Sequence, residues 1–192
     1  IMSWGSCFAD NISRKLIENK FSCDANPFGV LYNPLSVAQS LQTLLHERYY
    51  TENDLQYANG QWFSLMHHGS FSSADKDECL NGINERIRFG AANLRKARIA
   101  IITWGTARVY EWSADGSIVG NCHKLPEKMF RRRLLDVDEI VEKYVSLISE
   151  ILNCNPDLHF LFTVSPIRHA KDGFHGNQLN KATLLIALHK IC

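Results

Sequence analysis

The chain lacks several features that would narrow its function at once. Its six cysteines are scattered without a Cys-x-x-Cys pair, which excludes the usual zinc patterns and a compact disulfide framework. Reduced thiols and a cytoplasmic location are therefore expected. The net charge of +1 gives no overall field that would attract nucleic acid or an acidic membrane. No apolar run reaches membrane-spanning length and no signal peptide is visible, although the latter is weak evidence because the chain opens on Ile1.

What is present is typical of one globular domain. The 192 residues are 45% hydrophobic and 21% charged, enough to bury a core without disulfides or metal. Continuous apolar runs at 98–104 and 158–164 predict strands covered on both faces. Helical periodicity at 76–97, 138–153 and about 177–191 predicts helices between and after them. This alternation predicts a three-layer α/β fold with a parallel sheet over residues 1–192.

A short apolar run at the start of the chain ends in Gly5-Ser6 and passes directly into a helical pattern. Phe8, Ile12 and Leu16 follow at i, i+4 and i+8 spacing. Ser6 is thus expected where a strand turns into a helix, beside unpaired helix N–H groups. Nucleophilic serines are presented in this way, because the same turn helps to form an oxyanion hole. The alternative is an ordinary helix N-cap.

Other stretches predict less regular structure. The segment at about 49–75 is rich in aromatic residues and predicts an insertion that walls a substrate cleft or is packed by its own side chains. The adjacent His67 and His68 point in different directions on any regular element, so no metal site is predicted. Residues 108–120 alternate around a turn and predict a β-hairpin. The run Arg131–Arg133 is interpreted as the solvated side of a loop or helix start, with a phosphate or anionic-glycan contact as the alternative.

Short motifs along the chain resemble those of the GSCFA family, which is itself similar to the SGNH/GDSL hydrolases. The first motif, Gly5-Ser6-Cys7-Phe8-Ala9, spells the family's name. The later motifs follow in the family's order and span nearly the whole chain: Asn26-Pro27-Phe28-Gly29, Trp62-Phe63-Ser64, His67-His68, Thr103-Trp104-Gly105-Thr106-Ala107, Asn121-Cys122-His123-Lys124 and Ser165-Pro166-Ile167-Arg168-His169. The resemblance implies a flavodoxin-like, SGNH-like α/β sandwich with Ser6 as the nucleophile.

The resemblance also implies where an oxyanion hole would form. Gly29 matches the position of a glycine N–H donor, and Gly105 and Thr106 follow a strand that should end near Ser6. SGNH enzymes usually carry an asparagine in this block, but Ala107 stands where it would fall. Thr106 or Asn121 is the expected substitute, while the departure weakens the case for a standard oxyanion hole.

A serine hydrolase also needs a base and a carboxylate that orients it. Asp172 and His175 have the Asp-x-x-His spacing of SGNH enzymes and are expected in a loop over 168–177. His169 is a second candidate for the base or a pocket residue. In the family this pair usually follows one more strand, so the sequence also predicts a domain that is incomplete at its C-terminus. His123 and Arg168 are expected to line the pocket.

The leading prediction is an SGNH-like serine hydrolase that cleaves an ester, such as a carbohydrate O-acyl group, through an acyl-Ser6 intermediate. An acyltransferase that uses the same intermediate is a close variant. The alternative from another class is a non-catalytic ligand- or glycan-binding module of the same fold. No cofactor, metal, nucleic acid or membrane span is predicted, and the sequence does not fix the oligomeric state or the substrate.

Overall fold

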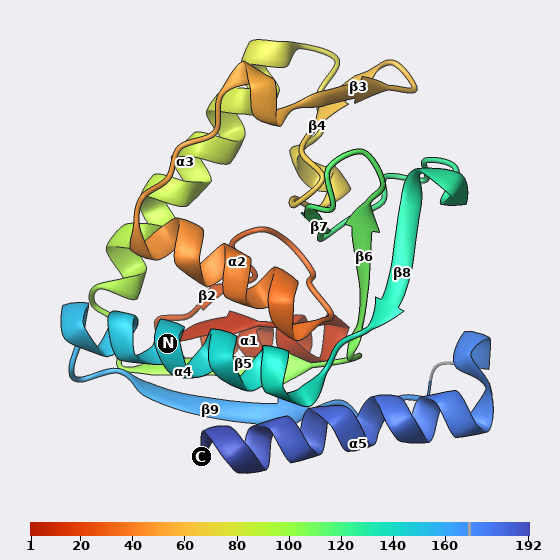
Figure 1. Ribbon diagram of the computed structural model, residues 1–192. Coiled ribbons are helices and arrows are strands. Elements are labelled where there is room, and N and C mark those ends of the chain that lie inside the picture. Colours follow the sequence, from red (N-terminus) through yellow and green to blue (C-terminus); the bar gives the residue numbers. More distant parts are fainter. Residues whose placement is uncertain (169) are drawn as a thin grey trace.

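The computed structural model describes residues 1–168 and 170–192, and a parallel sheet lies at its centre (Figure 1). Its strand order is β2–β1–β5–β9. The two continuous apolar runs form its central and edge strands, as the sequence predicts, with Ile99 opposite His159 in a fully parallel register. The strand bounds are β1 (Met2–Trp4), β2 (Asp24–Ala25), β5 (Ile99–Trp104) and β9 (His159–Val164).

Helices cover both faces of this sheet, which gives the three-layer α/β arrangement expected from the sequence. One face carries α1 (Cys7–Glu18). The other carries α2 (Pro34–Leu45) and α4 (Val137–Cys154), and α3 (Lys76–Leu94) packs on α2. The last helix, α5 (Gly173–Ile191), runs beside α4 and β9. None of the helices that the structure describes is long and apolar enough to cross a membrane.

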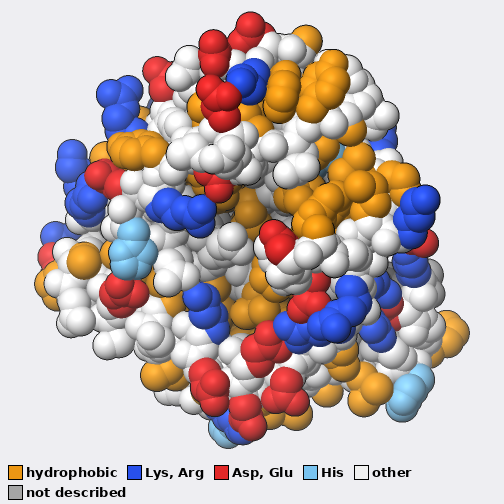
Figure 2. All heavy atoms as spheres, turned by 45° about the horizontal axis from the view of Figure 1, so that its top comes forward, with side chains coloured by type: hydrophobic (Ala, Val, Ile, Leu, Met, Phe, Trp, Pro, Cys, Tyr) orange, Lys and Arg blue, Asp and Glu red, His pale blue; other side chains and the backbone are white. Residues whose placement is uncertain are grey.

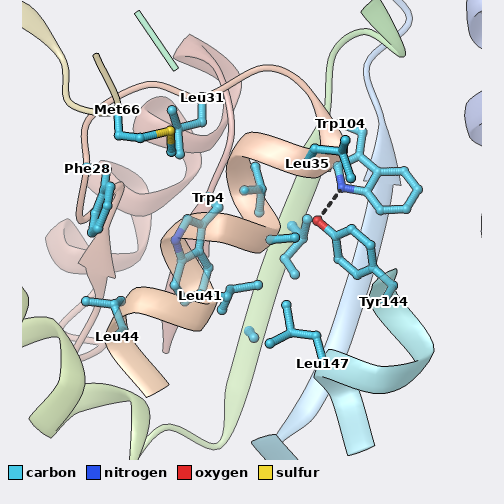
Figure 3. Packing of buried hydrophobic residues seen from close by; sticks show 14 of the residues in the cluster. Trp4, Phe28, Leu31, Leu35, Leu41, Leu44, Met66, Trp104, Tyr144 and Leu147 are labelled. Atoms are coloured by element: carbon cyan, nitrogen blue, oxygen red, sulfur yellow. Dashed lines mark hydrogen bonds between the residues drawn. The ribbon is translucent and has the colours of Figure 1, made fainter. Parts of the chain in front are cut away.

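The main core lies between the sheet and the α2–α4 layer (Figure 3). Trp4 and Trp104 point from neighbouring strands into this layer, and both are fully buried. Their indole N–H groups donate to Ser40 Oγ at 3.2 Å and to Tyr144 Oη at 3.2 Å. The Tyr144 hydroxyl in turn donates to the carbonyl of Pro34 at 2.9 Å, so each buried ring keeps a polar partner. These bonds fix α2 and α4 over the carboxyl half of the sheet.

The opposite layer is thinner, because α1 meets the sheet through small residues. Ala9 and Ser13 are buried against it, and Ser13 Oγ shares a 2.7 Å hydrogen bond with Ser3 Oγ of β1. Of the apolar residues whose spacing predicts the helix, Phe8 and Ile12 are exposed and Leu16 is half-buried. The periodicity therefore locates the helix correctly but not its buried face.

A second, antiparallel sheet stands at the carboxyl end of the parallel one, on the right of Figure 1. It has the order β7–β6–β8, with β6 (Arg108–Trp112), β7 (Ile118–Val119) and β8 (Phe130–Leu134). The hairpin predicted over 108–120 is confirmed. The interpretation of the arginine run as a loop or helix start is wrong, because residues 131–133 form the middle of β8 and pair with β6.

The aromatic segment at 49–75 contains a short hairpin, β3 (Gln56–Ala58) and β4 (Gln61–Phe63), and then folds around a buried histidine. His67 is 0% exposed and stacks on Phe28 with 4.1 Å between ring centroids. Its Nδ1 lies 3.0 Å from Ser64 Oγ, and burial lowers its pKa to about 3. A neutral imidazole thus acts as a core side chain here. No group of three or more metal-ligating side chains is found among the described residues.

Candidate active site

Ser6 lies in the tight turn between β1 and α1, as the sequence predicts. Gly5 has φ of +153°, and a Cβ there would lie 2.9 Å from Thr103 Cβ, so the turn requires glycine. Ser6 is the N-cap of α1, but its side chain makes no capping hydrogen bond. It is only 6% exposed, and its Oγ has no hydrogen-bond partner among the described residues. Buried hydroxyls normally find a partner, which makes this oxygen unusual.

Asn26 holds this turn from the neighbouring loop. Its Oδ1 accepts the Gly5 N–H at 2.9 Å, and its side-chain amide donates to the Asp10 carboxylate. Its own N–H donates to the Ser3 carbonyl at 2.8 Å, and its backbone has φ of +43°. In the sequence, Asn26 stands out only as the first residue of the motif Asn26-Pro27-Phe28-Gly29. The available signal is the residue type, since asparagine tolerates positive φ and bonds to nearby backbone.

Three of the four residues expected to supply oxyanion donors have N–H groups that already donate to backbone carbonyls. The Gly29 N–H donates to the Asn26 carbonyl at 2.8 Å. The N–H groups of Gly105 and Thr106 both donate to the carbonyl of Tyr32, at 2.8 and 3.1 Å. In this arrangement a substrate oxyanion would have to replace a carbonyl acceptor to use any of these donors.

Ala107 stands where an asparagine was expected. An asparagine does reach this segment, but it comes from α5. Asn180 Oδ1 accepts the Ala107 N–H, and its Nδ2 donates to Thr106 Oγ1 at 3.0 Å. The neighbouring Lys181 donates to the Gly105 carbonyl at 2.6 Å, and burial lowers the pKa of this lysine. No local sequence pattern indicates these contacts of Asn180, because they join segments more than seventy positions apart.

The structure does not join Asp172 to His175. The predicted loop over 168–177 is a short 3₁₀ helix, Ala170–Asp172, followed directly by α5. Asp172 is the N-cap residue of α5, but its side chain makes no capping hydrogen bond; it is 1% exposed and lies beside Arg108 and Arg132, whereas His175 is exposed in the first helical turn. Arg168 is exposed, and His169 lies outside the described residues. In the described part of the chain no base is hydrogen-bonded to Ser6 Oγ.

Asn121 and His123 separate in their roles. The Asn121 side chain accepts the His123 N–H at 2.9 Å. The His123 ring stacks on Phe63 at 4.2 Å and its Nε2 lies 2.9 Å from the Ser64 carbonyl, while burial lowers its pKa. It supports the aromatic segment, whereas Asn121 lines a cavity.

This cavity, about 660 Å³ in volume, opens where β5 ends and the antiparallel sheet begins. We call it the arginine cavity. Tyr32 lines it and also lies near Cys7 and Asp10 of α1; burial, followed by these two groups, raises the pKa of its phenol. Ser6 itself is not a lining residue. The polar and aromatic residues of its wall are Tyr32, Asn33, His68, Thr106, Arg108, Tyr110, Asn121, Arg132 and Lys171.

A larger groove of about 1150 Å³ lies on the other side of the antiparallel sheet, between that sheet, α2 and α4. The face shown in Figure 2 is hollowed near its centre and carries basic and acidic side chains close together. Glu111, Arg133, Glu139 and Lys143 line the groove. No residue predicted from the sequence to act in catalysis belongs to it, and of the arginine run for which an anion contact was the alternative, Arg133 lines it.

Comparison with known proteins complements this geometry. Neither the curated proteins nor the solved structures contain a match to the chain. The GSCFA family model matches residues 1–192, the whole chain, and the protein therefore belongs to the GSCFA family.

Proposed function

We propose that the protein is an ester hydrolase that uses Ser6 as its nucleophile. The observation that carries this proposal is the Ser6 hydroxyl, buried at the N-terminus of α1 with no described hydrogen-bond partner. A serine held by a rigid strand–helix turn, with its oxygen free of the cap bond, is available to bond to an acyl carbon. The fold contributes the position, because Ser6 follows a strand at the carboxyl edge of a parallel sheet.

In the proposed reaction, Ser6 Oγ forms a bond to the acyl carbon of the ester while its proton passes to a base. The bond to the alcohol oxygen breaks, and the alcohol leaves with a proton. Water then attacks the acyl-Ser6 ester and releases the acid. Two bases remain predicted: His175, oriented by the Asp172 carboxylate, or alternatively His169. The first would require the Asp172 carboxylate to exchange an arginine partner for the imidazole.

Labelling with a fluorophosphonate tests the nucleophile directly. We expect one adduct on the peptide that carries Ser6, located by mass spectrometry, and none in the Ser6→Ala variant. Ser13→Ala is the matched control, because Ser13 is also a buried serine of α1 but its hydroxyl is hydrogen-bonded to that of Ser3. An unlabelled wild-type protein, or equal labelling of Ser6→Ala, would contradict the proposal.

A non-catalytic ligand-binding module is the second candidate, and one observation favours it. The N–H groups of Gly29, Gly105 and Thr106 already donate to carbonyls, as a stable scaffold requires. This candidate predicts ligand binding at the arginine cavity with no covalent adduct on Ser6. An acyltransferase would form the same adduct and is separated by product analysis with an added alcohol acceptor.

A further inference from the structure

Two arginines from neighbouring strands share one carboxylate beside the arginine cavity. Arg108 Nε lies 3.1 Å from Asp172 Oδ1, and Arg132 Nη2 lies 2.7 Å from the same oxygen. In the antiparallel sheet Arg108 and Arg132 project on the same side, because Arg132 pairs with Tyr110, two residues after Arg108. Both arginine side chains line the cavity and are about a quarter exposed, at 25% and 27%.

The charges at this wall do not balance. Two guanidinium groups face a single carboxylate, and Lys171 adds a third cation to the lining. Lys171 has its own partner, Glu127, at 2.7 Å, which leaves one positive charge over on the arginine side. None of the described residues that line the cavity is acidic. An excess cation beside a concave, partly dehydrated surface favours an anion there.

The hydrogen bonds at this wall are also incomplete. The Nε–H groups of Arg108 and Arg132 are buried without an aligned acceptor among the described residues, and both oxygens of Asp172 likewise lack aligned donors. The contacts are therefore ion pairs by distance but not well-directed hydrogen bonds. Buried donors in this state are costly unless a ligand satisfies them, and a guanidinium matches carboxylate and phosphate oxygens particularly well.

Aromatic rings border the same cations. The Arg132 guanidinium lies over the Tyr110 ring, 5.7 Å from its centroid. Tyr32 lines the cavity on the side nearest α1. Thr106, at the end of β5, also lines it, and β5 is the direct neighbour of the strand that precedes Ser6. A ligand anion held by the arginines would thus lie at the same sheet edge as the proposed nucleophile.

We propose that the arginine cavity binds an anionic group of the substrate, so that the substrate is an ester carrying a carboxylate or phosphate. This inference rests on the proposed function for the word substrate, but the anion site itself does not depend on catalysis. Arg132 and Arg108 hold the anion, and Lys171 contributes long-range attraction. Tyr32 and Tyr110 contact the body of the ligand.

A binding experiment tests the anion site without any turnover. The full chain is titrated calorimetrically at low salt with phenyl phosphate, with phenylacetate and with benzyl alcohol as the uncharged analogue. We expect both anions to bind at least tenfold more tightly than benzyl alcohol. A clear preference between the two anions identifies which charged group the substrate carries. Equal affinity for the charged and uncharged probes would overturn the inference.

Matched variants separate the site from general charge effects. Arg132→Gln should weaken phenyl phosphate binding about tenfold, through the loss of a charge-assisted hydrogen bond. Arg131→Gln removes the same charge one residue earlier, on the opposite face of β8, and should change binding less than about twofold, since an exposed charge is screened. Lys171→Gln, at an exposed side chain, gives a second reading if Arg132→Gln does not fold. Equal losses in Arg131→Gln and Arg132→Gln would contradict the assignment.

Two chromogenic esters then connect the site to catalysis. Mono-4-nitrophenyl glutarate carries a carboxylate, whereas 4-nitrophenyl butyrate does not. We expect a higher kcat/KM for the glutarate and loss of that preference in Arg132→Gln. Anion binding with neither ester cleaved would overturn the proposed function and keep the anion site. Cleavage of both esters at equal rates without anion binding would do the reverse.

Discussion

Both faces of the β7–β6–β8 sheet carry arginines paired with carboxylates, but the two faces differ in the number of carboxylates for each arginine. On the groove face, Arg131 Nε and Arg133 Nε donate to Glu111 at 2.9 and 2.6 Å. Arg133 also makes two hydrogen bonds to Glu139 of α4, at 2.7 and 2.6 Å. Two arginines thus meet two carboxylates with aligned bonds. On the cavity face two arginines share Asp172, and their Nε–H groups lack aligned acceptors.

This difference separates structural charge from functional charge. A bidentate, neutralised network holds the sheet against α4 and offers little to a ligand. The incomplete cluster stabilises the fold less and leaves donors and charge for an incoming anion. Net charge does not reveal the contrast, because the whole chain is close to neutral. The partner of each arginine does.

A substitution that weakens the attachment of the antiparallel sheet should lower stability the most, because both of its faces depend on that attachment. The Gly120 N–H donates to the Leu65 carbonyl at 2.9 Å, and a Cβ at Gly120 would lie 2.6 Å from the Met66 carbonyl oxygen. Gly120→Ala should therefore lower the free energy of unfolding by about 2–3 kcal/mol, measured by urea denaturation. Gly82→Ala on α3 is the control and should be neutral or stabilising by up to ~1 kcal/mol, because nothing lies within 4 Å of its Cβ.

Opening the groove network should have the next largest effect. Glu111→Gln leaves Arg131 and part of Arg133 without a carboxylate, and we expect the free energy of unfolding to fall by about 2 kcal/mol. This is less than the ~3–5 kcal/mol of a fully buried pair, because the groove admits solvent. Glu142→Gln, an exposed carboxylate that lines the same groove, should change it by less than ~0.5 kcal/mol. Equal effects of the two variants would refute the distinction between network and lining.

The groove network should also be the acid-sensitive face. Hydrogen bonds from Arg133 lower the pKa of Glu111 and that of Glu139. A carboxylate with a lowered folded pKa contributes stability above its ordinary value near 4.5, and this is lost as pH falls through the folded pKa. Stability should therefore fall between pH 5 and 3 by under ~1.4 kcal/mol per pH unit for each proton bound.

The Glu111→Gln variant isolates this contribution from other groups that titrate in acid. Buried His67 resists protonation down to about pH 3 and also makes the folded state less stable as pH falls below 6.5. This second slope is common to both proteins and cancels in their difference. We expect the difference in unfolding free energy between wild type and variant to shrink as pH falls from 5 to 3. A constant difference would show that Glu111 contributes through packing rather than charge.

Removing the Asp172 carboxylate from the cavity face should have the smallest effect on stability, and it should strengthen anion binding. The Asp172 carboxylate is buried and its oxygens lack aligned donors, so the cost of its desolvation offsets much of its attraction to the two arginines, and in Asp172→Asn the unfolding free energy should fall by only about 1 kcal/mol. Affinity for phenyl phosphate should rise several-fold, because the competing carboxylate is gone. Calorimetry and urea denaturation on the same variant measure both effects. Weaker anion binding in Asp172→Asn would mean that the carboxylate positions the arginines rather than competing with a ligand.

The sequence predicts those parts of the fold in which local pattern and tertiary role agree. The apolar run at 98–104 is buried whatever packs on it, so strand β5 is read correctly. The arginine run at 131–133 has no apolar alternation, and its strand exists because Glu111 and Asp172 receive its side chains on opposite faces. The apolar positions of α1 locate the helix, but small residues at Ala9 and Ser13 decide its buried face.

At the site, the local sequence pattern locates Ser6 but not the residues that hold the segments around it. The position of Ser6 is a local property of a strand–turn–helix sequence. The Asn180 hydrogen bond to Thr106 and the arginine partners of Asp172 join segments 40 or more residues apart, which no local pattern reports. The spacing of Asp172 and His175 is local, yet Asp172 forms its ion pairs with arginines of the distant strands β6 and β8. The catalytic role of these two residues stays a prediction.

Successive side chains of β8 point to opposite faces, so the number of residues in the connection before β8 affects which arginines face the cavity. Tyr110 lies opposite Arg132, and Glu111 opposite Arg131. Adding or deleting one residue between 120 and 129, with the pairing shifted by one position, would turn Arg132 to the groove and Arg131 and Arg133 to the cavity. Changes of two residues would preserve the faces. Wherever the pairing shifts with the length of this connection, length variation among homologous chains should therefore occur in steps of two, or be accompanied by a β-bulge that restores the register.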